Sequence, residues 1–186
     1  MLIDYNKIPV LIKKIFKNKK GISVVELLVV AVIMAIGLVA LFNAVTSSLK
    51  TSRLMKENDQ AKELAQEALE AVRSFRDGTD WETDGLGTLN LYDPLDPLDP
   101  TSFYHPETID DPPKWNLASG EETMIMGIFT RKVIFESVSR DPTSKNIESV
   151  YNPDPAHADP NTRKVTATVS WQGKTMEIST LLTNWK

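Results

Sequence analysis

The residue most suggestive of chemistry in this chain is a carboxylate in an apolar setting. Residues 22–42 form an apolar run that is broken only by Ser23, Glu26 and Gly37. A carboxylate inside an apolar segment costs a few kcal/mol unless it finds a partner, so it is a candidate functional group. The simpler alternative is that Glu26 reaches a polar interface or is protonated. The apolar run alone leaves both interpretations of Glu26 open.

Residues for catalysis or metal binding are scarce. The 186 residues include no cysteine and two histidines, His105 and His157, both in proline-rich segments. Cysteine-based sites are thereby excluded and a multi-histidine metal site is disfavoured. The chain also has no G-x-S-x-G element and no glycine-rich phosphate loop. We predict no enzymatic activity, no catalytic residue, no bound metal and no cofactor.

The net charge of −4 conceals an asymmetry along the chain. Residues 1–21 carry six lysines against one aspartate (net +5), and residues 22–186 carry 15 basic and 24 acidic side chains (net −9). The acidic part offers no basic face for phosphates, so a nucleic-acid partner is not expected. The basic part directly precedes the apolar run, which predicts a membrane-spanning helix with its amino end in the cytoplasm.

One long helix is predicted to position Glu26. A helix over residues 22–42 would be about 32 Å long, which matches the hydrocarbon core of a bilayer. Neither Pro nor Gly follows Gly37 until Gly78, and apolar residues from Ala61 to Phe75 recur at helical spacing. We therefore expect a helix from about Ile22 to Phe75, about 80 Å long, with Gly78 as its C-cap. Its second half is amphipathic and forms the spine of a soluble domain.

The remaining sequence predicts acidic loops and a small antiparallel sheet. Segments 78–122 and 141–161 are rich in Asp and Pro and are expected to be surface loops. Strands are expected at Met124–Val138, Val165–Trp171 and Lys174–Leu182, the last two joined by a Gln172-Gly173 turn. The strictly alternating residues expected to be buried are Val165, Ala167, Val169 and Trp171. The helix face expected to receive the sheet consists of Leu64, Ala68 and Val72. The predicted fold class is α+β, because the helix precedes all the strands.

The first loop is either a calcium site or a simple solvated loop. It holds clustered aspartates, which are hard oxygen ligands. Their order lacks the D-x-D-x-D-G alternation of recognised calcium loops, so the solvated loop is preferred. The aspartates are Asp93, Asp96, Asp99, Asp110 and Asp111.

The junction between the basic and apolar segments resembles the amino terminus of type IV prepilins. That family has a basic leader ending in Gly, a cleavage point after the Gly, and Glu at the fifth mature position. Here Gly21 ends the leader and Glu26 is the fifth residue after it. The basic cluster of the leader is Lys17, Lys19 and Lys20. The resemblance implies that prepilin peptidase cuts between Gly21 and Ile22 and N-methylates Ile22. The family most often has Phe at this position, so Ile22 is a departure.

The resemblance also implies a type IV pilin-like fold and a partner for Glu26. In a filament, Glu26 of one subunit would face the amino terminus of a neighbour, and such a pair is strong in a low-dielectric core. The implied divisions are a cleaved cytoplasmic leader (1–21), a transmembrane and filament-core helix (22–42), an amphipathic helix (43–77) and a soluble domain of loops and sheet (78–186).

Later motifs carry weaker resemblances. Three segments resemble parts of minor pilins of the pilus-modification type: Phe129–Arg131, Val169–Trp171 and Leu181–Trp185. Ala65–Glu70 fits that group and also the minor pseudopilins of type II secretion. We expect the tryptophans in these motifs to fill the core between sheet and helix.

These resemblances imply a minor structural subunit of a type IV filament system. It would lie in the inner membrane with its carboxy-terminal domain in the periplasm or outside the cell, and it would assemble with other pilin or pseudopilin subunits. One alternative is a minor pseudopilin of a type II secretion or competence system. An alternative of another class is a single-pass, signal-anchored domain with no assembly role, in which Gly21 and Glu26 can be replaced without consequence.

Overall fold

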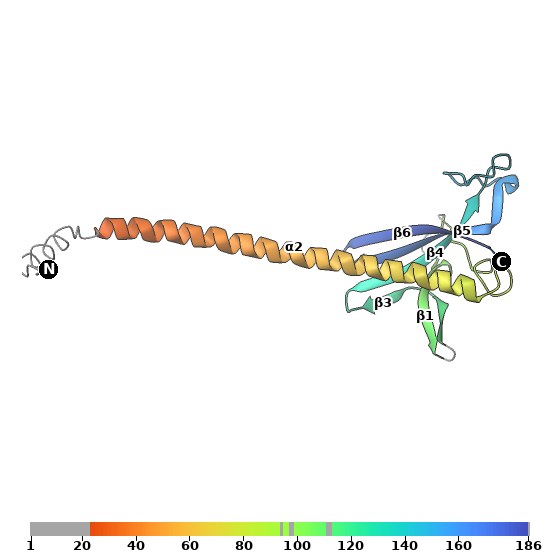
Figure 1. Ribbon diagram of the computed structural model, residues 1–186, viewed down its shortest axis with the longest axis horizontal. Helices are drawn as coiled ribbons and strands as arrows, with labels where there is room; N and C mark the ends of the chain where they lie inside the picture. Colours follow the sequence, from red (N-terminus) through yellow and green to blue (C-terminus); the bar gives the residue numbers. More distant parts are fainter. Residues whose placement is uncertain (1–22, 94, 97–98, 111–112, 186) are drawn as a thin grey trace, which may run out of the picture. The chain divides into compact units, whose positions relative to one another are not determined.

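The computed structural model describes residues 23–185, except 94, 97–98 and 111–112. The chain divides into two compact units between Arg53 and Leu54. Helix α2 (Val24–Gly78) contributes to both units, and all strands belong to the second (Figure 1). Within the described residues, this long helix followed by an antiparallel sheet confirms the predicted α+β, pilin-like layout.

In the first unit, the described residues are almost entirely helix. Every side chain from Ser23 to Lys56, across the unit boundary, is exposed. Among the described residues, only α2 is long and apolar enough to cross a membrane, with a mean hydropathy of 2.9 over its most apolar 18 residues. The predicted helix start at Ile22 lies outside the described residues.

The second unit contains six strands in one antiparallel sheet. The strand order is β2-β1-β4-β5-β6, and β3 pairs with β4 off this path. The strands are β1 (Tyr104–Asp110), β2 (Pro113–Ser119), β3 (Glu122–Ile125), β4 (Phe129–Ser139), β5 (Ala158–Trp171) and β6 (Lys174–Thr183). Two 3-10 turns, η2 (Pro100–Ser102) and η3 (Pro155–His157), precede β1 and β5.

The core of the second unit lies between α2 and the sheet, as predicted. Alanines and larger apolar residues form the buried stripe of the helix, and the small side chains allow the strands to approach closely. The stripe comprises Ala61, Leu64, Ala65, Ala68, Leu69, Ala71, Val72 and Phe75. The facing strand residues include Phe129, Val133, Phe135, Val165, Ala167, Val169 and Trp171. Removing these apolar surfaces from water is the main stabilisation of the unit.

The β5–β6 hairpin agrees with the sequence prediction. The four alternating residues of β5 are buried, as is Leu182 on β6. Gln172 and Gly173 have φ angles of 47° and 76°, the left-handed values of a type I′ turn. Val169 pairs with Met176 and Ala167 with Ile178 in this hairpin.

The prediction that residues 78–122 form only a loop is wrong. Strands β1 and β2 pair from Tyr104 with Ser119 to Asp110 with Pro113. An X-Pro step disfavours helix but suits extended backbone. Beyond Tyr104, whose partner on β4 is Val133, no further β1–β4 pair is formed among the described residues. Pro106 therefore lies in a two-stranded ribbon, where strand edges tolerate a missing N–H.

The predicted strand Met124–Val138 is in fact two strands, β3 and β4, joined by a turn. Met126 and Gly127 have φ angles of 48° and 81°. The N–H of Ile128 donates to the carbonyl of Ile125 at 3.2 Å, which closes a type I′ turn. The sequence does not predict this turn, because its residues are mostly apolar, as in a strand.

The prediction that segment 141–161 is only a loop is also wrong, because β5 already begins at Ala158. The β4–β5 register shifts between Ser137, which pairs with Arg163, and Val138, which pairs with Asp159. Pro160 falls in the resulting bulge, where a ladder N–H is not required.

Two smaller predictions need correction. Gly78 ends α2 without taking a left-handed conformation; instead the Thr79 hydroxyl donates to the carbonyl of Phe75 at 2.8 Å.

Trp171 is buried in the core, as expected, whereas Trp185 is 64% exposed. The indole N–H of Trp185 donates to Asp77 at 3.3 Å, so this ring lies on the surface beside the helix end.

Candidate assembly site

The candidate site begins at the first turn of α2. The Ser23 carbonyl accepts the N–H of Leu27 at 3.1 Å, and its hydroxyl oxygen accepts the N–H of Val25 at 3.3 Å. Ser23 therefore caps the helix and satisfies one of its free N–H groups. Glu26 follows three residues later, the spacing of a capping box. Its carboxylate also suits the positive end of the helix dipole.

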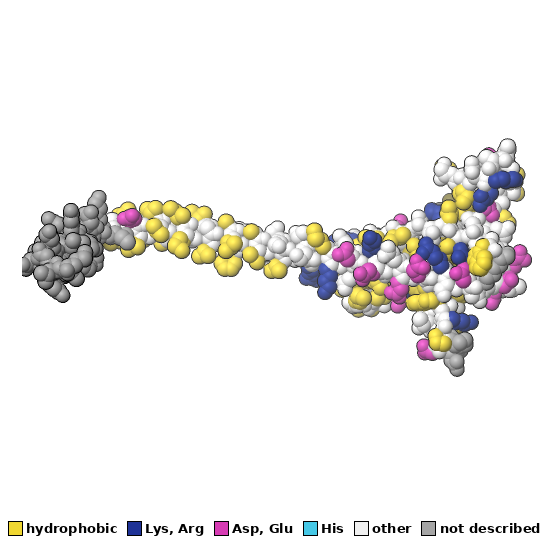
Figure 2. All heavy atoms as spheres, viewed as in Figure 1, with side chains coloured by type: hydrophobic (Ala, Val, Ile, Leu, Met, Phe, Trp, Pro, Cys, Tyr) yellow, Lys and Arg dark blue, Asp and Glu magenta, His cyan; other side chains and the backbone are white. Residues whose placement is uncertain are grey.

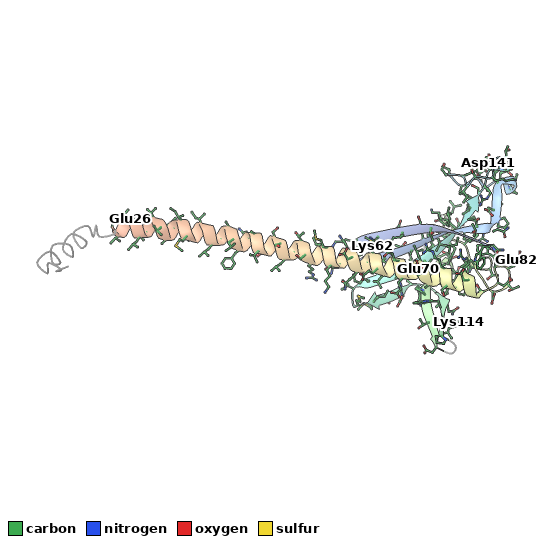
Figure 3. The ribbon with its side chains drawn as sticks, in the orientation of Figure 1. Glu26, Lys62, Glu70, Glu82, Lys114 and Asp141 are labelled. Carbon is green, nitrogen blue, oxygen red and sulfur yellow. The ribbon has the colours of Figure 1, made fainter. Side chains whose placement is uncertain are left out.

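Glu26 is exposed on a helix whose neighbouring side chains are exposed and apolar. Figure 3 labels Glu26 at the start of the described helix, and Figure 2 shows hydrophobic side chains along the segment that follows. Val25 is 67% exposed and Leu28 is 62% exposed. From Ser23 to Leu49, Glu26 is the only charged residue in the sequence. A cation that pairs with it must come from outside this segment.

Two threonines after the apolar run bond to carbonyls of the preceding turn of the helix. The Thr46 hydroxyl donates to the carbonyl of Phe42 at 2.9 Å, and the Thr51 hydroxyl donates to that of Ser47 at 3.0 Å. Such bonds to the preceding turn let hydroxyl groups lie in an apolar environment without a further partner. The segment can therefore pack against lipid or apolar helices beyond the strictly apolar run.

The remaining predicted site residues lie outside the described residues. These are Gly21 and Ile22 at the predicted cleavage point and the leader lysines Lys17, Lys19 and Lys20. Only Glu26 of the predicted set has a described environment.

A buried arginine in the second unit is a structural centre that the sequence analysis does not predict. Arg131 on β4 is 4% exposed. It donates to the Leu64 carbonyl of α2 at 3.3 Å and pairs with Glu67 at 3.2 Å. Its Nε donates to Glu122 on β3 at 3.0 Å. Arg131 thus ties helix α2, β3 and β4 together. The sequence does carry one signal for this site. Arg131 alternates with Phe129 and Val133 in a predicted strand, so its side chain is expected on the face that points into the core.

A hollow beside β4, β5 and β6 has a pair of opposite charges in its lining. Its volume is about 510 Å³, and its lining includes Glu136, Lys164, Tyr151 and Leu181. Lys164 and Glu136 are 2.9 Å apart and neutralise each other. Such a pair offers neither a free base nor an activated nucleophile.

The two histidines have structural contacts. His105 Nδ1 lies 3.1 Å from the carbonyl of Gly120, and His157 Nδ1 lies 3.0 Å from Glu148. Among the described residues, no group of three or more His, Asp and Glu side chains is placed to hold a metal ion.

Comparison with known families gives a match at the amino-terminal end of the chain. Residues 16–42 match the prokaryotic N-terminal methylation motif, which is the type IV prepilin-like signature. This confirms the predicted resemblance for the amino-terminal region and indicates a pilin- or pseudopilin-like precursor. The motif is that of structural pilin-type proteins and not of enzymes. No curated protein and no solved structure compared with the chain gave a significant match.

Proposed function

We propose that this chain is a minor structural subunit of a type IV filament system. It is synthesised as a precursor, inserted in the inner membrane and cut between Gly21 and Ile22 by prepilin peptidase. The same enzyme methylates the new amino group of Ile22. The mature subunit then assembles with other pilins through its apolar helix.

One observation carries the proposal. The methylation motif at residues 16–42 coincides with an exposed apolar helix whose sole charge before Lys50 is Glu26. A membrane anchor needs only the apolar length, since a carboxylate weakens insertion. An assembling helix needs in addition a feature that fixes its register, and a charge pair can supply one.

The proposed mechanism rests on the new amine created by cleavage. The amine of Ile22 in one subunit pairs with the Glu26 carboxylate of its neighbour. Inside a helix bundle both groups are shielded from water, so a matched pair is favoured and an unmatched charge is penalised. Subunits that dock out of register leave both charges unpaired. The pair therefore selects one axial position.

The proposed topology follows the charge distribution. The basic leader, residues 1–21, stays in the cytoplasm, and residues 22–42 span the inner membrane before assembly. Residues 43–77 continue the helix, and the acidic domain of residues 78–186 lies in the periplasm or outside the cell. Assignment to a pilus is preferred on the resemblance of the later motifs, with a secretion or competence pseudopilus as the alternative.

The first test is the intact mass and amino-terminal sequence of the protein purified from membranes that contain prepilin peptidase. We expect a chain that starts at Ile22, with or without one added methyl group. A chain that still starts at Met1 would overturn the filament assignment and favour a signal-anchored domain.

A variant separates specific processing from general proteolysis. Gly21→Arg should leave the leader attached and keep the protein in the membrane. Normal removal of the leader in this variant would show that Gly21–Ile22 is not the scissile bond.

A further inference from the structure

Helix α2 carries a short basic segment beyond its apolar run. No acidic residue lies between Glu26 and Glu57 in the sequence, but this stretch contains three cations, Lys50, Arg53 and Lys56. All three are exposed, and Figure 2 shows dark blue side chains where the hydrophobic part of the helix ends. From Glu57 onward the chain carries 12 basic and 23 acidic side chains. The basic segment is therefore a local reversal of charge in an otherwise acidic part of the protein.

The spacing and direction of these side chains suit an anionic surface at the apolar end of the helix. Lys50 and Arg53 are three residues apart in α2, the separation at which helix side chains are neighbours. Long side chains on an α-helix point back toward its N-terminus. That direction leads here to the apolar run, so the two cationic groups extend toward the boundary of the membrane that the run is proposed to cross.

The length of the helix places the cations beside a bilayer surface. Val24 and Lys50 are 26 residues apart in α2, which corresponds to about 39 Å of helix. The hydrocarbon core of a bilayer is about 30 Å thick, and the headgroup layers extend the total to about 40–45 Å. With Val24 at one boundary of the core, Lys50 lies about 9 Å beyond the other, within about one Debye length of the lipid phosphates.

The residues between the apolar run and Lys50 are compatible with a headgroup layer. Residues 43–49 contain no charged side chain and no proline, and all of them are helical. The Thr46 hydroxyl donates to the carbonyl of Phe42 at 2.9 Å, so it needs no other partner. The helix can therefore pass through the headgroups without interruption and present its first cation on their outer side.

We propose that Lys50 and Arg53 bind the phosphate groups of anionic phospholipids in the outer leaflet of the inner membrane. This inference rests on the membrane topology of the proposed function. The bound lipids fix the depth of the helix before assembly, because the cations on this side oppose movement of the helix toward the cytoplasm. They also attach an acidic domain to a membrane surface of the same charge.

The competing partner for these cations is the acidic surface of another subunit. Carboxylates and phosphates both attract lysine and arginine, so charge alone does not separate the two. The depth of Lys50 and the direction of its side chain favour the lipid, since both place the cation at the headgroups while the subunit is still in the membrane.

The absence of natural cysteine permits a test with one fluorescent label. The full-length chain carrying Leu49→Cys is labelled with a donor and reconstituted in phosphatidylcholine vesicles that contain some phosphatidylglycerol. Energy transfer to acyl-labelled phosphatidylglycerol is compared with transfer to acyl-labelled phosphatidylcholine. A donor–acceptor pair with a Förster distance shorter than the bilayer thickness excludes lipids gathered around the leader on the opposite face.

Because each cation near an anionic surface favours binding by about fivefold, we expect phosphatidylglycerol to be enriched around the donor by about threefold or more. High salt should remove most of this enrichment. Lys50→Gln/Arg53→Gln should reduce the enrichment to less than about 1.5-fold, whereas Lys50→Arg/Arg53→Lys, which keeps both charges, should retain it.

A second double variant provides the matched control. Lys62→Gln/Lys114→Gln removes the same charge at two exposed positions, which Figure 3 labels on α2 and in the second unit. Lys62 lies twelve residues beyond Lys50 in α2, about 18 Å further along the helix. We expect this variant to keep the wild-type enrichment.

The outcomes separate this proposal from its rival and from the filament function. Equal transfer to the two lipids in the wild type, or unchanged enrichment in Lys50→Gln/Arg53→Gln, would overturn the lipid site. If that variant keeps its lipid preference but is not incorporated into filaments, the cations bind another subunit and the proposal falls. Leader cleavage in cells is measured separately. A leader that stays attached, together with lipid enrichment that depends on Lys50 and Arg53, would overturn the filament function and support the lipid site.

Discussion

At the scale of single residues, the turn between β3 and β4 (residues 124–128) holds a methionine in a left-handed backbone conformation. Met126 occupies a left-handed position that costs an L-residue about 1 kcal/mol relative to glycine. We predict that Met126→Gly raises the unfolding free energy by about 1 kcal/mol. Denaturant unfolding of the full chain in detergent, followed by tryptophan fluorescence, to which the buried Trp81 and Trp171 contribute, measures this change. A loss of stability would show that the side chain contributes more by packing than its backbone costs.

Arg131 is the residue that pattern analysis fails to place. Its guanidinium is nearly fully buried, whereas Glu67 and Glu122 are 48% and 35% exposed. Removing a carboxylate leaves the buried cation less well compensated, but replacing the arginine removes the charge itself. We predict that Glu122→Ala lowers the unfolding free energy by about 1–3 kcal/mol, more than Arg131→Met does. Unfolding curves in the same detergent test the order, and the reverse order would mean that the arginine contributes net stability.

At the scale of elements, an ion pair joins the end of β4 to the start of β5. Burial raises the pKa of Asp159, but hydrogen bonds from Thr162, Arg140 and Asn161 outweigh it and hold the pKa below its usual value. Arg140 Nε lies 2.9 Å from the carboxylate. Because the pKa of Asp159 is lower in the folded state, the ionised carboxylate stabilises the fold when the pH is above the unfolded-state pKa. This contribution is lost as the pH falls through the folded-state pKa.

The expected result is a pH-dependent effect of Asp159→Asn. The variant should be less stable than the wild type at pH 7, and the difference should shrink as the pH falls below about 4. Asp141, whose pKa is also lowered, by hydrogen bonds from Ser144 and Thr143, remains in both proteins and does not affect the comparison. A difference that stays constant across this range would assign the effect to shape and not to charge.

The elements differ in how well the sequence predicts them. The β5–β6 hairpin is predictable because strict alternation coincides with a Gln-Gly turn. The β1–β2 ribbon is not, because Pro106 and Pro113 suggest a loop, although edge and terminal strand positions accept proline. The β3–β4 turn escapes prediction because its methionines are typical of a strand and only backbone angles show their left-handed conformation. Glu26 can be singled out as a candidate from its setting alone, since no other charge interrupts the apolar run, and its pairing role stays a prediction.

At the scale of the whole molecule, the central prediction concerns Glu26. Glu26→Gln keeps the side-chain shape and removes the charge, so insertion and leader cleavage should be unchanged. In the proposed pairing the neighbouring amine loses its partner, and we therefore expect incorporation into sheared or purified filaments to fall at least tenfold, equivalent to about 1.4 kcal/mol per docking event. Immunoblots of membrane and filament fractions measure how much of the protein is in each fraction. Normal incorporation of Glu26→Gln would remove the pairing role from this carboxylate.

The order of the elements along the chain also governs how the protein is made. The buried stripe of α2 ends at Phe75, and its first large strand partner on β4, Phe129, follows 54 residues later. Ribosomes add about 5–20 residues per second, so the stripe waits on the order of several seconds before the sheet can cover it. During that interval the nascent chain exposes an amphipathic helix with an uncovered apolar face. The helix is therefore complete several seconds before strands β4, β5 and β6, which cover most of its apolar face, have been synthesised.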